Sequence, residues 1–134
     1  MAGLPGDIVP ALLTCATGGL VHGHREIAEM MGVNAFQPSA CVVMATEGYP
    51  ESYPKGSIIK GISDADAVDG VKVFHAGTDK DSDQSLIAVG GRVLGVTASG
   101  DDLKQAIDRA YAGVEKIDWP QGFYRKDIGW RALN

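Results

Sequence analysis

The hydrophobic pattern of the chain changes near residue 39. Before that point, apolar residues recur at the three- and four-residue steps of an α-helix. They are Ile8, Val9, Leu12, Leu13 and Ala16. The pattern predicts a helix over residues 7–17, capped by Asp7 and followed by two helix-terminating glycines. Residues 24–31 predict a shorter second helix that stops at Gly32.

From residue 39 onward, short apolar runs alternate with polar turns. The run at 40–45 is continuously apolar, which predicts a buried strand. Four further strands are predicted, at residues 57–62, 71–76, 85–89 and 92–98. Their spacing favours an antiparallel or mixed sheet joined by hairpins, with 79–84 as one hairpin tip.

A longer helical pattern begins after the last predicted strand. Ser99 and Asp102 resemble the two ends of a capping box, and Trp119-Pro120 marks the end of the helix. The apolar face of this helix comprises Leu103, Ala106, Ile107, Ala110, Tyr111, Val114 and Ile117. Strands followed by one amphipathic helix predict an α+β fold.

Composition limits the classes of function. A chain of 134 residues, 45% of them apolar and 22% charged, suits one globular domain with a real core. The net charge of −5 argues against an electrostatic nucleic-acid binder. No apolar run reaches the roughly 20 residues of a membrane span, and no secretion signal is recognisable, so the cytoplasm is the expected location.

Cysteine and histidine residues offer little chemistry of their own. Cys15 and Cys41 form no CxxC pair and are expected to be reduced and buried. His22 and His24 lack further ligands at usable spacing, so no metal site is predicted. His75 lies in a strand pattern, where it is either a hydrogen-bonded core residue, which is the favoured interpretation, or a group that faces a cleft.

The sequence holds no P-loop, GxSxG, HExxH or EF-hand pattern, so no catalytic residue is assigned. Gly90-Gly91-Arg92 combines close backbone approach with a planar donor fork, which suits a phosphate or carboxylate. Spacing alone favours the plainer alternative, a hairpin turn with a solvated arginine. Lys126, Asp127 and Arg131 similarly fit a surface ion-pair cluster of little energetic worth.

The C-terminal segment, residues 124–133, is unusual for a chain end. It carries Arg125, Lys126 and Arg131, together with one carboxylate and two aromatic residues. Frayed termini are usually small and polar, so this segment is predicted to be docked.

Four segments, taken in order, resemble the C-terminal domain of phosphoribosylamine–glycine ligase, also called glycinamide ribonucleotide synthetase. They are CVVMATEGYPESYPKG at 41–56, VKVFHAGT at 71–78, GGRVLGVTA at 90–98 and FYRKDIGWRAL at 123–133. The resemblance implies that residues 39–134 form this C-terminal domain. It also implies that residues 1–38 are a helical linker segment at the end of the family's ATP-grasp region.

The resemblance further implies an activity. The family joins phosphoribosylamine and glycine, using ATP, to give glycinamide ribonucleotide in de novo purine biosynthesis. ATP activates the glycine carboxylate as an acyl phosphate, which the ribosylamine nitrogen attacks. ATP and magnesium are held mainly by the ATP-grasp part, and the C-terminal domain is a small β-rich, barrel-like or sandwich-like unit. It closes one wall of the active-site cleft.

By analogy with related ligases, Arg92 is expected at the 5′-phosphate of phosphoribosylamine, with Gly90 and Gly91 allowing the approach. Arg125, Lys126 and Arg131 are further candidates for the same cleft, or for docking onto the N-terminal and ATP-grasp domains. The chain is then inactive alone. The alternative is a stand-alone, non-catalytic module that binds a phosphorylated ligand or a protein partner. An exposed apolar patch would favour the ligase part, whereas a polar or self-associating surface would favour the module.

Overall fold

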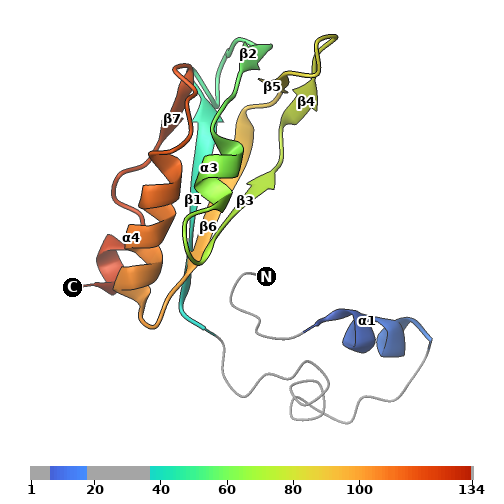
Figure 1. Ribbon diagram of the computed structural model, residues 1–134, viewed down its shortest axis with the longest axis vertical. Helices are drawn as coiled ribbons and strands as arrows, with labels where there is room; N and C mark the ends of the chain where they lie inside the picture. Colours follow the sequence, from blue (N-terminus) through green and yellow to red (C-terminus); the bar gives the residue numbers. More distant parts are fainter. Residues whose placement is uncertain (1–6, 18–36, 134) are drawn as a thin grey trace.

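The computed structural model describes residues 7–17 and 37–133 (Figure 1). Its helices are α1 (Val9–Ala16), α3 (Ile62–Asp66), α4 (Leu103–Val114) and the short 3₁₀ turn η1 (Trp130–Ala132). Its strands are β1 (Ser39–Thr46), β2 (Ser57–Ile58), β3 (Val71–His75), β4 (Thr78–Lys80), β5 (Leu86–Ala88), β6 (Arg92–Ser99) and β7 (Gly122–Tyr124). The predicted α+β class is confirmed.

The strands form two antiparallel sheets. The larger has the order β3-β6-β1-β7, and the smaller has the order β2-β5-β4. Within the described residues both sheets are open, since β3 and β7 end one and β2 and β4 end the other. The antiparallel pairing agrees with the prediction from strand spacing, whereas a closed barrel is not confirmed.

The core lies between α4 and one face of the larger sheet. Figure 1 shows α4 and α3 on the same side of this sheet. The buried sheet residues include Val42, Met44, Val71, Val73, Leu94, Val96 and Ala98, and the helix adds Ala106, Ile107, Ala110 and Val114. A Cβ on Gly113 would lie 2.8 Å from Val71 Cγ1, so the glycine lets the helix approach the sheet closely.

Helix α4 starts later than predicted. Ser99 is the last residue of β6, and the N-cap is Asp102, whose carboxylate accepts a hydrogen bond from Gln105 N at 2.7 Å. Gln105 Oε1 in turn accepts from Asp101 N at 2.7 Å. The capping pair is therefore Asp102 with Gln105, because β6 keeps Ser99 in its ladder.

Several predicted boundaries were wrong. The strand expected at 57–62 ends at Ile58, because Gly61 adopts a φ of 80° and the chain turns into α3, which was not predicted. Strands β4 and β7 were also missed, since each has only three residues and no apolar run. Pairing of β4 with β5 and of β7 with β1 makes them strands, which local sequence does not reveal.

At the N-terminus, the helix predicted over 7–17 is confirmed as α1. The N-cap is Ile8 rather than the predicted Asp7, because Ile8 O accepts the first intrahelical bond; Asp7 lies one residue earlier, and its Oδ1 accepts from Val9 N at 2.9 Å. The helix predicted at 24–31 lies outside the described residues. No helix in the described ranges is long and apolar enough to cross a membrane.

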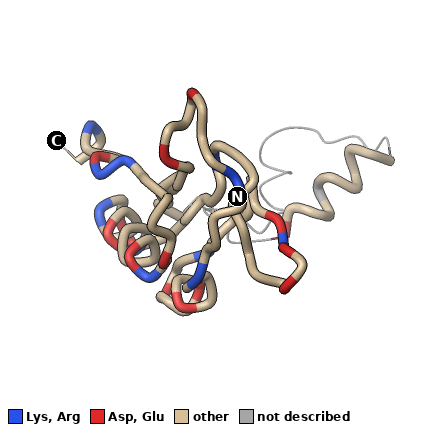
Figure 2. Tube along the Cα trace, turned by 90° about the horizontal axis from the view of Figure 1, so that it is seen from above, with Lys and Arg blue, Asp and Glu red and all other residues tan. Residues whose placement is uncertain are grey.

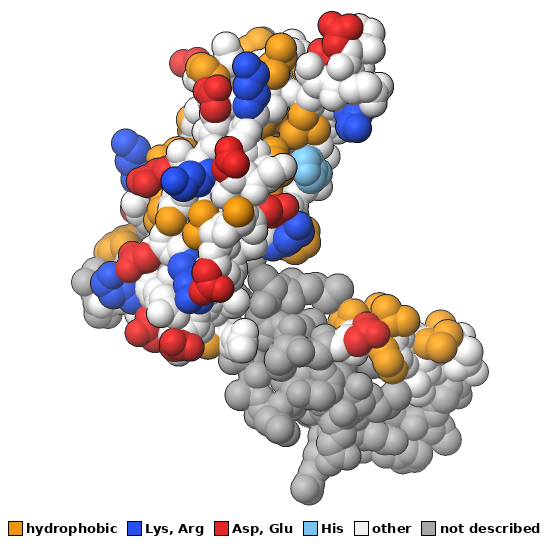
Figure 3. Space-filling view, viewed as in Figure 1, with side chains coloured by type: hydrophobic (Ala, Val, Ile, Leu, Met, Phe, Trp, Pro, Cys, Tyr) orange, Lys and Arg blue, Asp and Glu red, His pale blue; other side chains and the backbone are white. Residues whose placement is uncertain are grey.

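Charged residues of both signs are interspersed over the described chain (Figure 2). From the side of α4 and α3, Figure 3 likewise shows acidic and basic side chains mixed together, whereas hydrophobic side chains gather on α1. On α1, Val9, Leu12 and Leu13 are all more than half exposed. This pattern shows no single-sign patch on the viewed face.

Asp66 ties α3 to the edge strand β3. Its Oδ1 accepts from Val73 N at 2.7 Å, and its Oδ2 accepts from Lys72 Nζ at 2.8 Å. Partial burial raises the pKa of the Asp66 carboxyl, but these hydrogen bonds and the lysine charge outweigh it and hold the pKa below its ordinary value. The carboxylate therefore stabilises the fold above about pH 4, and this is lost as the pH falls through the lowered pKa.

Replacing Asp66 by alanine is expected to lower the free energy of unfolding by about 1–3 kcal/mol at neutral pH, because Val73 N loses its acceptor. Urea denaturation would measure the loss, which should shrink below about pH 4 as the native carboxylate becomes protonated. Asp69→Ala is the control, since Asp69 pairs with Arg109 but is 88% exposed. Equal losses in the two variants would contradict the role of Asp66.

Candidate functional site

The face of the larger sheet that points away from α4 is not covered by any described element. Along β1, Val42 and Met44 are buried against the helix, whereas the alternate residues Cys41 and Val43 are exposed. This is the two-residue alternation of a strand with one covered face. On the uncovered face, Val43 is 43%, Phe74 49% and Phe123 42% exposed.

This geometry corrects the prediction for the cysteines. Both Cys15 and Cys41 are free, but both are exposed rather than buried. The continuous apolar run at 40–45 suggested a strand covered on both faces. Because only one face of β1 packs against α4, Cys41 lies on the open face.

A hollow of about 310 Å³ lies on this open face, at the corner where β1, β6 and β7 meet. Its lining is mainly apolar and includes Cys41, Val43, Ala45, Tyr49 and Phe123, with Tyr124 and Ile128 beside them. Two arginines, Arg92 and Arg125, complete it. The hollow is therefore mainly apolar, and the two arginines are the charged residues of its lining.

Gly90 and Gly91 shape this corner by packing. Gly90 N donates to Gly77 O at 3.1 Å, and Gly90 O accepts from Thr46 Oγ1 at 2.8 Å. A Cβ on Gly91 would lie 2.1 Å from Tyr49 Cδ2. The N–H of Gly90 is thus already used within the fold, and Gly91 makes room for the Tyr49 ring. The glycines therefore shape the wall beside Arg92.

Arg92 is the first residue of β6 and pairs with Ala45, just after an irregularity in the β1 register. Its side chain is exposed, and within the described residues it makes no ion pair. An unpaired guanidinium keeps all of its donors for a ligand. The alternative, a solvated arginine in a hairpin turn, explains the exposure but not the shared hollow with Arg125.

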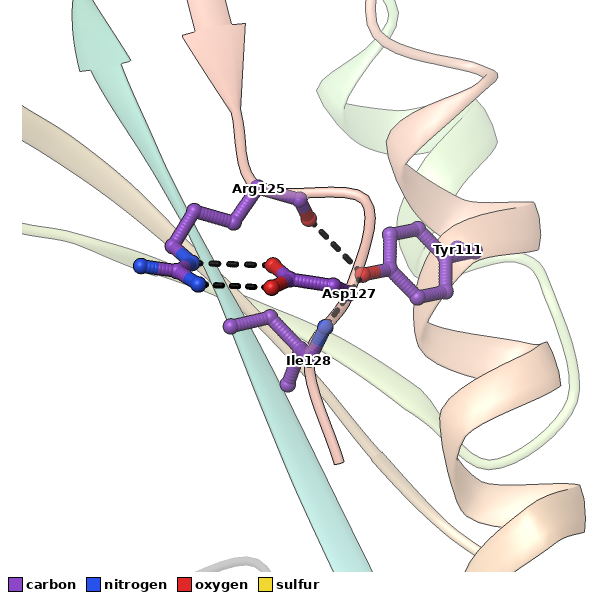
Figure 4. Close-up of polar contacts among 4 residues, drawn as sticks. All are labelled: Tyr111, Arg125, Asp127 and Ile128. Atoms are coloured by element: carbon purple, nitrogen blue, oxygen red, sulfur yellow. Dashed lines mark hydrogen bonds and ion pairs between the residues drawn. The ribbon is translucent and has the colours of Figure 1, made fainter. Parts of the chain in front are cut away.

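Arg125 follows β7 directly, and its guanidinium forms a two-pronged pair with Asp127 (Figure 4). The Nε–Oδ1 distance is 2.9 Å and the Nη2–Oδ2 distance is 2.6 Å. The hydrogen bond from Arg125 holds the pKa of Asp127 below its ordinary value. The charged cluster expected from Lys126, Asp127 and Arg131 is therefore centred on Arg125 instead.

The remaining candidates lie apart from the hollow. Arg131 stacks over the Trp130 ring, with Cζ 5.2 Å from the ring centroid, and lines a neighbouring open hollow formed by the C-terminal turn. Lys126 is exposed and lines neither of these two hollows. Of the predicted residues, the structure brings Arg92 and Arg125 together, with Gly90 and Gly91 beside Arg92.

His75 does not belong to the core, contrary to the favoured interpretation. It is exposed at the end of β3, where Nδ1 lies 3.1 Å from Thr78 Oγ1. Within residues 7–17 and 37–133, no three His, Cys, Asp or Glu side chains come close enough to hold a metal ion. His22 and His24 lie outside these ranges.

Sequence reasoning missed the apolar lining and the support behind Arg125. Tyr111 was assigned to the core face of α4, yet its hydroxyl donates to Arg125 O at 2.7 Å and accepts from Ile128 N at 3.1 Å. No local signal predicts that contact, because Tyr111 and Arg125 are 14 residues apart. For Cys41 and Val43, the alternation along β1 was the available signal.

Comparison with known proteins identifies the relatives of this chain. Residues 39–131 match the family model described as phosphoribosylglycinamide synthetase, C domain. The chloroplastic phosphoribosylamine–glycine ligase of Arabidopsis thaliana is 50% identical over 99% of the chain, and the Mesorhizobium japonicum ligase is 54% identical over 99%. The chain spans only 24% and 29% of the length of these two relatives.

A solved structure of a ligase of the same name shares this fold. The crystal structure of phosphoribosylamine–glycine ligase from Thermotoga maritima superimposes with a TM-score of 0.68 and 28% sequence identity. The match covers 89% of this chain and 26% of the crystallised one. The chain therefore belongs to the phosphoribosylamine–glycine ligase family, and the part of the family that it matches is the C domain.

Proposed function

We propose that this chain serves as the C-terminal part of a phosphoribosylamine–glycine ligase, which joins phosphoribosylamine and glycine at the expense of ATP in purine biosynthesis. The observation that carries the proposal is the similarity of nearly the whole chain to about a quarter of such ligases. The family match starts at residue 39, which supports a boundary between a linker segment at 1–38 and the domain at 39–134. We also propose that this domain is similar in fold to the C-terminal domains of other ATP-grasp ligases.

In this proposal Arg92 binds the 5′-phosphate of phosphoribosylamine. The support is physical: Arg92 is exposed, has no acidic partner among the described residues, and lines a hollow with a second guanidinium. A guanidinium matches the geometry of two phosphate oxygens. Gly90 and Gly91 shape the wall beside it, and Arg125 is the second cation. Lys126 and Arg131 are assigned to docking onto the other domains.

ATP and magnesium are assigned to other domains of the ligase. The described residues contain no cluster of three potential metal ligands. ATP supplies the energy that activates the glycine carboxylate, and no residue of this chain is assigned a bond-making step. The contribution of this domain is to bind and orient the phosphorylated sugar. The cytoplasm stays a proposed location, since one relative is named as a chloroplastic enzyme.

The uncovered sheet face favours this role over a stand-alone module. Three large apolar side chains, Val43, Phe74 and Phe123, are each between 42% and 49% exposed on one face. A monomeric domain seldom leaves such a group uncovered, whereas a domain that packs against the remainder of an enzyme does. We assign this face to contact with the ATP-grasp part.

Reassembly of the ligase tests the proposal. The chain would be mixed with the Mesorhizobium japonicum ligase from which the matching region has been removed. Given ATP, magnesium, glycine and phosphoribosylamine, the mixture is expected to release ADP, whereas each component alone is not. If the mixture neither formed a complex nor released ADP, the stand-alone binding module would be favoured. Turnover by the chain alone would contradict the assignment of ATP chemistry to the other domains.

A further inference from the structure

The two arginines of the hollow differ in their surroundings. Arg92 has no acidic partner among the described residues, whereas Arg125 is held by both oxygens of Asp127. A guanidinium carries five N–H donors, and Asp127 takes one from Nε and one from Nη2. The two on Nη1 and the second on Nη2 stay available. Arg125 therefore keeps three donors for a ligand, with a carboxylate beside its charge.

The ion pair contributes little to stability. The side chain of Arg125 is 71% exposed and that of Asp127 is 49% exposed. Ion pairs this open to water contribute little to stability, because solvent and salt screen the attraction. The effect of Asp127 is instead on geometry, because two hydrogen bonds fix the plane of the guanidinium. An arginine that is held in place loses less rotamer freedom when it binds a ligand.

Tyr111 anchors the backbone on both sides of this pair. Its hydroxyl donates to Arg125 O and accepts from Ile128 N, so one side chain bridges the turn from 125 to 128 (Figure 4). Tyr111 belongs to α4, which packs against the sheet that carries the hollow. Its ring also lies 6.1 Å from that of Tyr124. The turn that carries Arg125 is thereby tied to the rigid part of the fold.

From these contacts we infer that Tyr111 and Asp127 are positioning residues, which hold Arg125 so that it binds the hydroxyl groups of a phosphorylated sugar. The inference rests on the proposed function, in which Arg92 takes the phosphate. A free guanidinium suits the dianionic phosphate, whereas one already paired with a carboxylate suits neutral hydroxyl groups. Arg92 would thus bind the phosphate of the ligand, and Arg125 would bind its sugar hydroxyl groups.

The test compares two probes on the whole 134-residue chain. Inorganic phosphate and ribose 5-phosphate would each be titrated by isothermal calorimetry, and the ratio of their affinities is the readout. Tyr111→Phe, which keeps the ring and so its packing, is expected to lower the preference for ribose 5-phosphate about fivefold. Asp127→Ala should lower it by about as much or more. Neither change should weaken binding of inorganic phosphate.

Matched controls remove the same chemical groups elsewhere. Tyr53→Phe deletes a hydroxyl from a ring that packs on Tyr49 without lining the hollow. Asp108→Ala breaks the exposed pair with Lys104 on α4. Both should leave the ratio unchanged. Adding Arg125→Ala to Tyr111→Phe should cause less loss than Arg125→Ala causes in the unaltered chain, because the two residues act as one unit.

The outcomes separate this inference from the proposed function. If Arg92→Ala weakens both probes while Tyr111→Phe and Asp127→Ala leave the ratio unchanged, the positioning role is wrong and the phosphate role stands. If these two variants shift the ratio but Arg92→Ala changes nothing, the phosphate role of Arg92 is wrong. If the unaltered chain binds neither probe, both roles are overturned for this chain.

Discussion

Replacing Arg92 by alanine in the reassembled ligase is expected to lower kcat/KM for phosphoribosylamine by about 10- to 100-fold. A hydrogen bond to a charged group is worth roughly 1.5–3 kcal/mol, which corresponds to that range. Arg92 has no ion pair among the described residues, so its removal leaves no buried carboxylate behind. The loss would therefore report on binding rather than on folding. The KM for glycine should change little.

Two comparisons sharpen this measurement. Arg92→Lys keeps the positive charge but loses the planar fork, so it should fall between the unaltered chain and Arg92→Ala. Lys104→Ala removes a cation from the exposed face of α4, where its pair with Asp108 is worth little. That variant should behave like the unaltered chain. An unchanged KM for phosphoribosylamine in Arg92→Ala would contradict the proposal that Arg92 binds the 5′-phosphate.

Removal of residues 123–134 is expected to lower the free energy of unfolding by about 3–5 kcal/mol. Most of β7, which pairs with β1 from Met44 to Thr46, would be lost. Tyr124 and Ile128 pack against the core, and their half-buried side chains contribute about 1–2 kcal/mol each. The Tyr111 hydroxyl would also lose both of its partners, at a further cost of about 1–2 kcal/mol.

Thermal unfolding would measure this loss. A domain of this size shifts its Tm by about 4–8 °C per kcal/mol, so the expected decrease exceeds about 12 °C. Removing only residues 133–134 is the control, because Leu133 is 48% exposed and should contribute little. A similar Tm for the long truncation and the control would show that the C-terminal segment contributes nothing to the fold.

The docked C-terminal segment shows how far local sequence reaches. Its aromatic and charged composition predicted docking, which the structure shows for Tyr124 and Ile128, since both pack against the core, whereas Trp130 and Leu133 are about half exposed. That composition did not reveal β7, since this strand has only three residues and they do not form an apolar run. Nor did it distinguish Arg125 from Lys126 and Arg131, because the hollow that only Arg125 of the three lines is formed by residues far away in the sequence.

Helix α4 and the central strands were predictable because their apolar periodicity is strong and local. The capping pair was displaced by three residues, since the β6 ladder retains Ser99 and makes Asp102 the N-cap. Local propensity favoured the earlier start, but the pairing of β6 with β1 and β3 overrode it.

The order and spacing of motifs determined the family and the α+β class, since both depend on residues that are near one another in the chain. Tertiary structure alone decided which face of the larger sheet is covered, that the sheets are open, and that Arg92 and Arg125 share one hollow. These features depend on contacts between residues that are far apart in sequence. No local pattern encodes them, because each results from the packing of α4, β6 and β7 around β1.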